Sequence, residues 1–150
     1  MTRASVYEYV GGDPAFLALA AAHHRRCLAD PELAHPFEHG IRDDHVERLA
    51  AYWAEVFGGP PRYSREFGGH GAMIGVHAGQ GMGEGFGERF ARCFLEAADD
   101  AGFPADEDLR ALLRNYIEAA TAEVEGYSPA GSVVPAGLPM PRWSWDGAST

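Results

Sequence analysis

The chain has 150 residues, of which 46% are hydrophobic, and its formal net charge is −10. This length and apolar content predict one ordinary domain with a substantial core, and the negative charge argues against nucleic-acid phosphates or anionic membranes as partners. No apolar run approaches the roughly 20 residues that span a bilayer, and no signal-peptide core follows the first residues. Cys27 and Cys93 lie in helical patterns among apolar residues, which favours buried thiols in a reducing cytoplasm.

Helical spacing recurs along the chain and two-residue alternation is almost absent, so the sequence predicts an all-α domain. A short helix around 6–10 ends at the pair Gly11-Gly12. Asp13-Pro14 begins a helix that runs to about Ala29, with the aspartate as its cap. The residues expected on the inward face of this helix are Leu17, Ala20, His24, Cys27 and Leu28.

A short turn begins at Asp30-Pro31 and ends near residues 35–37. Asp43 or Asp44 caps the next helix, which runs to Phe57 and ends at the glycine and proline residues 58–61. Its inward face is expected to carry His45, Leu49, Tyr52, Trp53 and Val56. A loop with Tyr63, Phe67 and two glycines then leads to a short helical turn that ends at His77.

Glycines at alternate positions from 79 to 87 end that turn, because each costs about 1 kcal/mol in a helix interior. A long helix is expected from about Glu84 to Asp100, and Asp106 caps the last one. The inward residues of the last helix are Leu109, Leu112, Leu113, Tyr116, Ile117 and Ala120. Past Gly126 the composition shifts to Pro, Gly and Ser, which predicts a domain over 1–126 and an extended tail over 127–150.

Three histidines stand where a core would normally carry apolar side chains: His24, His45 and His77. A buried imidazole without a partner costs roughly 1–3 kcal/mol, and any single one is usually a satisfied core histidine. Three on separate elements could converge on one pocket, and such an arrangement favours a metal site. Neutral imidazole is a good ligand for transition metals, including the iron of haem.

Two kinds of metal site remain open from the residues alone. One is a bare ion held by several imidazoles, with further ligands from His35, His39, Asp43 or Asp44, although the usual zinc spacings are missing and His35 and His39 fit a solvated loop. The other is a haem held by one imidazole in an apolar pocket. The side chains available to wall that pocket are Phe37, Leu49, Val56, Met73, Val76, Met82, Phe86 and Phe90.

Four motifs in order, over about residues 6–125, resemble the truncated haemoglobins, and group II most closely. Tyr7 to Gly12 resembles the turn that joins the first two helices of that family, and residues 30–37 resemble the segment that places a haem-packing Phe. Gly58-Gly59-Pro60 with Tyr63 is similar to the turn after the distal helix, and residues 76–82 resemble the proximal His with its Gly-x-Gly turn. Paired glycines suit such sharp turns because they permit positive φ.

The resemblance implies a 2-over-2 helical sandwich around haem b, with His77 as proximal iron ligand and Phe37 on the distal haem face. It places His24 where the family usually has a distal Tyr, and His45 at the distal gate, one turn before Leu49. Phe90 stands where group II usually has a Trp. Arg48 is placed to pair with a haem propionate, or is a solvated charge. The other residues implied around the cofactor are Tyr63, Met73, Val76, Met82 and Phe86.

The distal Tyr and Trp are missing, so the hydrogen bond to a bound ligand is left to His24 or His45, each of which can donate one N–H when neutral. The family implies binding of O2, NO or CO, and hence oxygen transport, NO dioxygenation or peroxidase-like turnover with peroxide and an unidentified reductase. The alternatives are a six-coordinate bis-His gas or redox sensor or electron-transfer globin, and a non-haem metal-binding helical protein. The tail is expected to strap onto the domain, with a cap over the haem edge or a homodimer contact left open.

Overall fold

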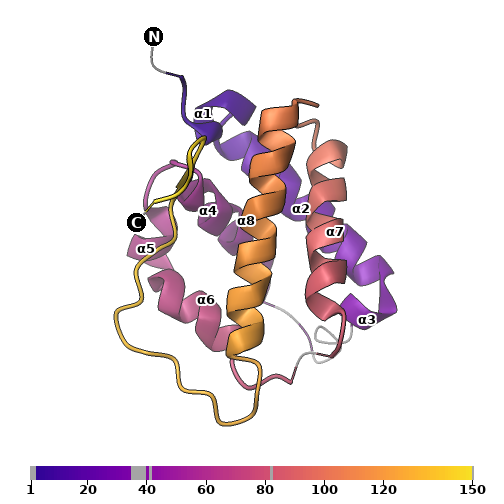
Figure 1. Ribbon diagram of the computed structural model, residues 1–150, viewed down its shortest axis with the longest axis vertical. Coiled ribbons are helices and arrows are strands. Elements are labelled where there is room, and N and C mark those ends of the chain that lie inside the picture. Colours follow the sequence, from indigo (N-terminus) through magenta and orange to yellow (C-terminus); the bar gives the residue numbers. More distant parts are fainter. Residues whose placement is uncertain (1–2, 35–39, 41, 82, 150) are drawn as a thin grey trace.

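The computed structural model describes residues 3–34, 40, 42–81 and 83–149. Helices account for most of these residues, and a short hairpin lies in the C-terminal tail (Figure 1). The elements are α1 (Val6–Val10), α2 (Asp13–Ala29), α3 (Pro31–Ala34), α4 (His45–Val56), α5 (Arg62–Glu66), α6 (Gly69–His77), α7 (Phe86–Asp100), α8 (Glu107–Gly126), β1 (Trp143–Ser144) and β2 (Gly147–Ala148).

Two helix pairs stack on each other to form the core. Helix α2 packs against α4, α7 packs against α8, and α2 also packs against α7, so the two pairs form one sandwich. In Figure 1, α7 and α8 run side by side across the front and α2 crosses behind them. This arrangement confirms the predicted all-α, 2-over-2 fold. Within the described ranges, no helix combines the length and apolar composition needed to cross a membrane.

The boundaries and inward face of α8 follow directly from its sequence. The Asp106 carboxylate accepts a hydrogen bond from the Leu109 backbone N–H at 3.1 Å, which satisfies one of the unpaired donors at the start of the helix. Leu109, Leu113, Tyr116 and Ile117 then follow at three- and four-residue spacing and are each at most 2% exposed. The predicted helix and its apolar stripe are therefore confirmed.

The predicted inward face of α2 is wrong in part: Ala20 and Cys27 are buried as expected, but the two leucines are not. Leu17 and Leu28 are 47% and 49% exposed, whereas Phe16 and Leu19 are fully buried. Phe16 stacks between Tyr7 and Phe57, with ring centroids 6.0 Å away on each side. Because α2 carries apolar residues around much of its circumference, hydrophobic spacing does not choose its face. The Phe16 ring determines which face of α2 is buried, since it has the most apolar area to bury.

Residues 62–66, predicted as loop, form helix α5. The start of α5 is held from outside, because the buried Glu55 carboxylate accepts hydrogen bonds from the backbone N–H and the hydroxyl of Ser64. A five-residue helix shows no periodicity of its own, and its cap comes from another helix. Helix α6 also exceeds the predicted single turn and runs over nine residues.

The two glycines after α4 serve different purposes. Gly58 has φ +101°, a backbone conformation that other residues rarely adopt. At Gly59 the constraint is space, because a Cβ atom would lie 2.7 Å from the Ala54 carbonyl oxygen and 2.7 Å from the Tyr7 ring. The Gly59 backbone N–H donates to that same carbonyl. The turn therefore brings α4 against α1, where the Tyr7 N–H donates to the Phe57 carbonyl at 3.0 Å.

The tail returns from α8 to the N-terminal part of the chain (Figure 1). Strands β1 and β2 pair antiparallel, and the two tryptophans of this hairpin face different neighbours. Trp143 packs edge-on against Tyr116 in the core, at 5.6 Å between ring centroids. The Trp145 indole N–H donates to the Ala4 carbonyl at 2.7 Å, and the Arg3 guanidinium lies 3.6 Å from its ring centroid.

Candidate functional site

His77 is the last residue of α6, and its hydrogen bond defines which ring nitrogen is available. Its Nδ1 lies 2.8 Å from the Met73 carbonyl oxygen, which can only accept, so Nδ1 carries the proton. The other nitrogen, Nε2, is then unprotonated and has a lone pair for a metal. The following loop is fixed to the end of α8, since the Gly79 and Gly81 N–H groups donate to the Tyr127 and Ser128 carbonyls.

His24 and His45 lie close to each other and to His77. The His24 and His45 ring centroids are 5.0 Å apart. Burial lowers the pKa of His45, and the neighbouring His24 and His77 lower it further. Burial also lowers the pKa of His24. The structure therefore brings together one histidine from each of α2, α4 and α6, and two of them favour the neutral form that ligates metals or donates a single N–H.

The apolar side chains predicted around the cofactor differ in their surroundings. Leu49, Met73 and Phe90 are partly buried and pack against the core. Tyr63 is buried, with its ring edge-on to Tyr52 at 5.1 Å. Two more stand further out: Val76 is 67% exposed, and Phe86, the first residue of α7, is half-buried. Their roles stay predictions, and the predictions for His35, Phe37, His39 and Met82 concern residues outside the described ranges.

Arg48 already has partners on the protein. Its Nε donates to the Asp44 carboxylate at 2.8 Å, one turn earlier in α4, and its guanidinium lies 4.6 Å from the Phe67 ring centroid. The side chain is 27% exposed. A propionate would therefore share this arginine with Asp44, so the predicted pairing stays a prediction.

His23, which the sequence analysis did not single out, is the most deeply buried histidine of α2, at 2% exposure. Its ring packs edge-on against Phe90 and Trp53, and Cys27 Sγ lies 3.5 Å from its Nδ1. Burial lowers its pKa to about 4. Adjacent histidines in an apolar helix look alike in sequence, and only the rotation of α2 decides which one enters the core.

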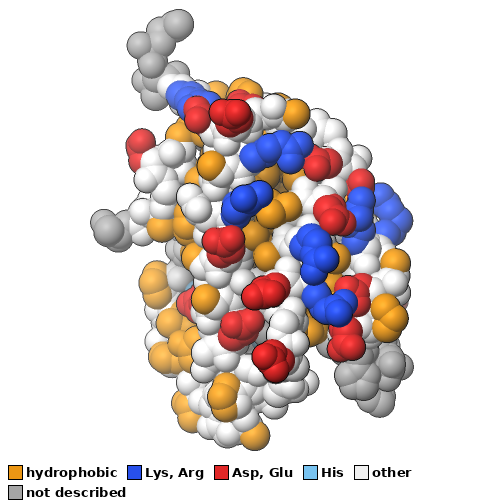
Figure 2. Space-filling model, turned by 45° about the vertical axis from the view of Figure 1, so that its right-hand side comes forward, with side chains coloured by type: hydrophobic (Ala, Val, Ile, Leu, Met, Phe, Trp, Pro, Cys, Tyr) orange, Lys and Arg blue, Asp and Glu red, His pale blue; other side chains and the backbone are white. Residues whose placement is uncertain are grey.

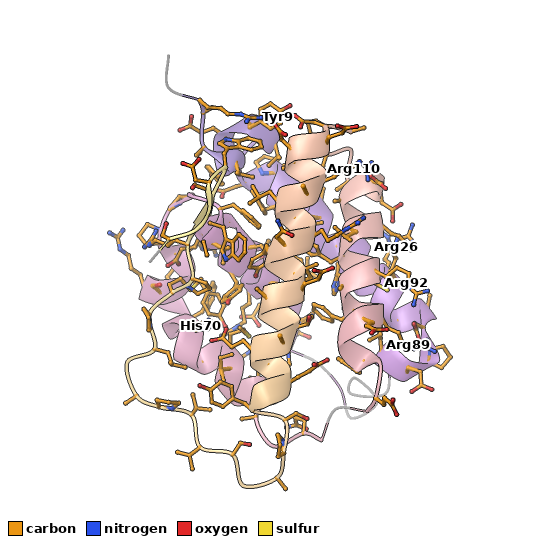
Figure 3. All side chains as sticks on the ribbon, in the orientation of Figure 1. Tyr9, Arg26, His70, Arg89, Arg92 and Arg110 are labelled. Atoms are coloured by element: carbon orange, nitrogen blue, oxygen red, sulfur yellow. The ribbon has the colours of Figure 1, made fainter. Side chains whose placement is uncertain are left out.

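A second missed feature is a hydrogen-bonded chain of Tyr52, His70 and Glu123. The Tyr52 hydroxyl lies 2.9 Å from His70 Nδ1, and His70 Nε2 lies 2.9 Å from the Glu123 carboxylate. Figure 3 shows His70 on α6, on the side that faces α8. The sequence signal for this hydrogen-bonded chain was a seven-residue spacing. Tyr52 follows His45 by seven residues and His70 precedes His77 by seven residues, so each pair lies about two turns apart on one face of its helix.

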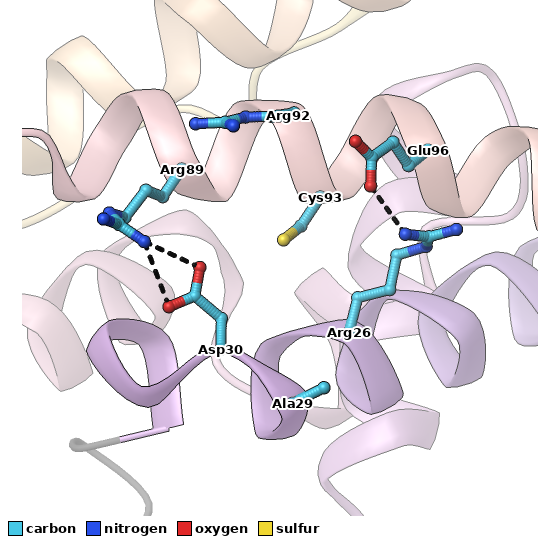
Figure 4. A pocket seen from close by; sticks show the side chains of 7 residues that line it. All are labelled: Arg26, Ala29, Asp30, Arg89, Arg92, Cys93 and Glu96. Atoms are coloured by element: carbon cyan, nitrogen blue, oxygen red, sulfur yellow. Dashed lines mark hydrogen bonds and ion pairs between the residues drawn. The ribbon is translucent and has the colours of Figure 1, made fainter.

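The surface hollow in Figure 4 lies between α2 and α7, and no histidine is among the described residues that line it. Its charges largely compensate each other, since Arg26 pairs with Glu96 and Arg89 pairs with Asp30. The same interleaving of acidic and basic side chains is visible over the face in Figure 2. Among the described residues, no group of three or more His, Cys, Asp or Glu side chains is arranged to hold a bare metal ion.

Comparison with known proteins identifies a family and solved structures that this chain resembles. The bacterial-like globin family model matches residues 5–122. Haemoglobin from the thermophilic phototrophic bacterium Chloroflexus aurantiacus is 27% identical, with 81% of this chain and 98% of that chain covered and a TM-score of 0.70. A thermostable haemoglobin from the actinobacterium Thermobifida fusca is 26% identical, with 90% and 100% covered and a TM-score of 0.69.

The likeness extends to a more distant structure. The group II truncated haemoglobin from Bacillus anthracis is 17% identical, with 91% of this chain and 98% of that chain covered and a TM-score of 0.72, which shows the shared fold. No curated protein matches the sequence. Since the family model spans most of the residues and the solved structures share the 2-over-2 sandwich, the chain belongs to the bacterial-like globin family, with the fold of the truncated haemoglobins.

Proposed function

We propose that this globin holds haem b through His77 Nε2 and binds a small ligand, O2, NO or CO, on the side of His24 and His45. Membership of the globin family implies haem-based binding of small ligands. The observation that carries the residue assignment is the 2.8 Å hydrogen bond from His77 Nδ1 to the Met73 carbonyl. It leaves Nε2 as the lone-pair donor and fixes the plane of the ring, as second-shell bonds to metal-binding histidines do.

The residues present fit a haem. Leu49, Met73 and Phe90 offer partly buried apolar surface, Met73 is hydrogen-bonded to His77 through its carbonyl, and a porphyrin needs apolar walls around an axial imidazole. When bound, the haem supplies an iron coordination position for the ligand. His24 or His45 would donate an N–H toward that ligand, since each favours the neutral state at neutral pH because its pKa is lowered.

A second candidate function follows from the closeness of His45 to His77. His77 contributes to the lowered pKa of His45, which supports the proposal that these two imidazoles bind one iron from opposite sides. The protein would then be a bis-His gas or redox sensor or an electron-transfer globin, in which an external ligand displaces His45 or His24.

Catalytic use of the same pocket, as NO dioxygenation or peroxidase-like turnover, needs electrons from outside the domain. The enzymatic proposal therefore includes a separate reductase. We also propose, as one role of the C-terminal tail, that it forms the contact of a homodimer. A cytoplasmic setting is also proposed, supported by Cys27 and Cys93, which are both free thiols.

The test is a haem titration of the purified chain, followed by spectra of the ferrous form with and without CO. We expect a Soret band at one haem per chain that shifts when CO binds. A low-spin six-coordinate ferrous spectrum that becomes high-spin in His45→Ala or His24→Ala supports the bis-His alternative. A high-spin ferrous spectrum in the unaltered chain supports the ligand-binding proposal, and a colourless chain after titration overturns both.

A further inference from the structure

Tyr52, His70 and Glu123 form a continuous polar path from the core to solvent. Tyr52 and His70 are each 4% exposed, whereas the Glu123 side chain is 40% exposed. The two hydrogen bonds of the path, from the phenol to His70 Nδ1 and from His70 Nε2 to the carboxylate, are both 2.9 Å long. The path joins three helices, α4, α6 and α8, and Tyr116 is a further neighbour of the Tyr52 hydroxyl.

The chemistry of the end group determines where the protons lie. Glutamate is ionised at neutral pH and its carboxylate only accepts hydrogen bonds, so His70 Nε2 carries a proton and donates a hydrogen bond to Glu123. A neutral His70 then has a bare Nδ1, which accepts the hydrogen bond of the Tyr52 hydroxyl. The phenolic proton is therefore aimed at a base whose positive charge, once formed, faces a carboxylate.

The environment of Tyr52 opposes loss of its proton alone. Burial raises the pKa of Tyr52, and the neighbouring Tyr116 and Glu123 raise it further. A phenolate is therefore strongly disfavoured at this position. Loss of an electron together with the proton leaves a neutral side chain instead, which burial penalises far less than a charged one.

We propose that Tyr52 is a redox-active tyrosine, which gives up one electron to an oxidant in the haem pocket while its phenolic proton moves to His70 Nδ1. The tyrosine becomes a neutral radical and His70 becomes an imidazolium paired with Glu123. Tyr52 lies on the same face of α4 as His45, about 10 Å further along the helix axis. The source of the oxidant rests on the proposed haem function.

Hydrogen peroxide and ferrous haem iron together provide a balanced reaction. One peroxide takes up two electrons and two solvent protons to form two water molecules. A bound ferrous haem would supply one electron and become ferric, and Tyr52 would supply the other. The phenolic proton stays on His70 until an external reductant reduces the radical, when it returns to the oxygen.

The hydrogen-bond arrangement can be tested without haem. In the haem-free chain, and as a second sample in the ferrous CO form, 15N NMR of the imidazole nitrogens reports the tautomer of His70. We expect protonated Nε2 and unprotonated Nδ1. A protonated Nδ1 in both forms overturns the inference, even if haem binds as proposed.

The redox step is tested by electron paramagnetic resonance of the haem-loaded ferrous protein, frozen after mixing with hydrogen peroxide. We expect a tyrosyl radical that is lost in Tyr52→Phe. The matched control is Tyr9→Phe, because Tyr9 is exposed and its hydroxyl donates to the Asp106 carboxylate, with no histidine involved. An unchanged radical in Tyr52→Phe overturns the assignment.

Two substitutions distinguish the role of His70 as proton acceptor from its role as a hydrogen-bond partner in the structure. His70→Gln can still hydrogen-bond the phenol but has no basic nitrogen, whereas His70→Leu removes both properties. Since a positioned acid–base group commonly contributes at least about 10²-fold to a rate, we expect radical formation to slow at least that much in both variants. Wild-type radical formation in His70→Gln overturns the role of His70. If no Soret band appears, the proposed haem function is overturned. The tautomer of His70 is still decided by the NMR test.

Discussion

The contact between α2 and α7 and the contact between α4 and α6 are built from different chemistry. Around Phe94, which is fully buried, the rings of Trp53, Tyr116 and His23 pack within 6.4 Å. Between α4 and α6, by contrast, Tyr52 and His70 are joined by a hydrogen bond, and their rings stack at 6.0 Å between centroids. Apolar packing is shared among many side chains, whereas the α4–α6 link depends on single residues. The first contact is therefore held by buried apolar area, and the second by a specific polar pair.

The comparison is tested most strongly at Phe94. Phe94→Ala removes a ring at the junction of both helix pairs, and large-to-small core changes of this kind cost about 3–5 kcal/mol. Tyr52→Phe removes only a hydroxyl and leaves a buried His70 nitrogen unsatisfied, at roughly 1–3 kcal/mol. Urea unfolding followed by circular dichroism measures both. Equal losses would contradict the distinction between the two contacts.

The second prediction concerns pH and His23. Its folded pKa, about 4, lies below the unfolded value near 6.5, so below pH 6.5 the unfolded chain binds the proton and the folded chain does not. The free energy of unfolding therefore keeps this contribution above pH 6.5 and loses about 3 kcal/mol in all as the pH falls to about 4. His24 and His45, whose pKa values are also lowered, add to the slope.

His23→Leu removes the largest part of this dependence, because leucine fills a similar volume and does not titrate. The free energy of unfolding, measured in urea from pH 7 to pH 4, should fall less steeply in the variant than in the unaltered chain. The same slope in both would show that His23 is not held neutral in the core.

The turn after α4 provides the third prediction. In Gly59→Ala the new Cβ would lie 2.7 Å from both the Ala54 carbonyl oxygen and the Tyr7 ring, and overpacking of this kind costs about 1–3 kcal/mol. The control is Gly71→Ala in α6, where nothing lies within 4 Å and φ is not positive. Alanine there should be neutral or stabilising by up to about 1 kcal/mol. Thermal unfolding of both variants checks the contrast.

The smallest expected effect is at the tail. Trp145→Ala removes the contacts with Arg3 and Tyr9 and the hydrogen bond to the Ala4 carbonyl, at a cost of about 1–2 kcal/mol for one cation–π and one aromatic pair near the surface. Trp145→Phe keeps the ring and should lose less. The haem spectrum should not change, and a shifted Soret band in Trp145→Ala would place the tail over the haem edge instead.

Local signals predicted much of this fold. The Asp106 cap and the apolar stripe of α8 both lie within one helix, and the paired glycines at 11–12 and 58–59 mark turns that the structure contains. His77 stood out because a run of glycines ends its helix directly afterwards. Such features depend on neighbours in sequence, so the chain alone reveals them.

The features that sequence reasoning missed depend on tertiary contacts. The choice between His23 and His24 follows from the rotation of α2, which Phe16 determines through contacts with α1 and α4. Helix α5 is capped by Glu55, which belongs to α4. His70 and Glu123 are 53 residues apart, and no local pattern connects a histidine in one helix to a glutamate in another.

The central claim is that His77 binds the haem iron, and His77→Gly tests it most directly. The variant removes the imidazole and leaves a space that free imidazole can enter, while His70→Gln is the control because it removes an imidazole two turns earlier in α6. We expect His77→Gly to lose the ferrous spectrum of an imidazole-bound haem and to regain it when imidazole is added, with His70→Gln unchanged. An unaltered haem spectrum in His77→Gly without imidazole would contradict the account.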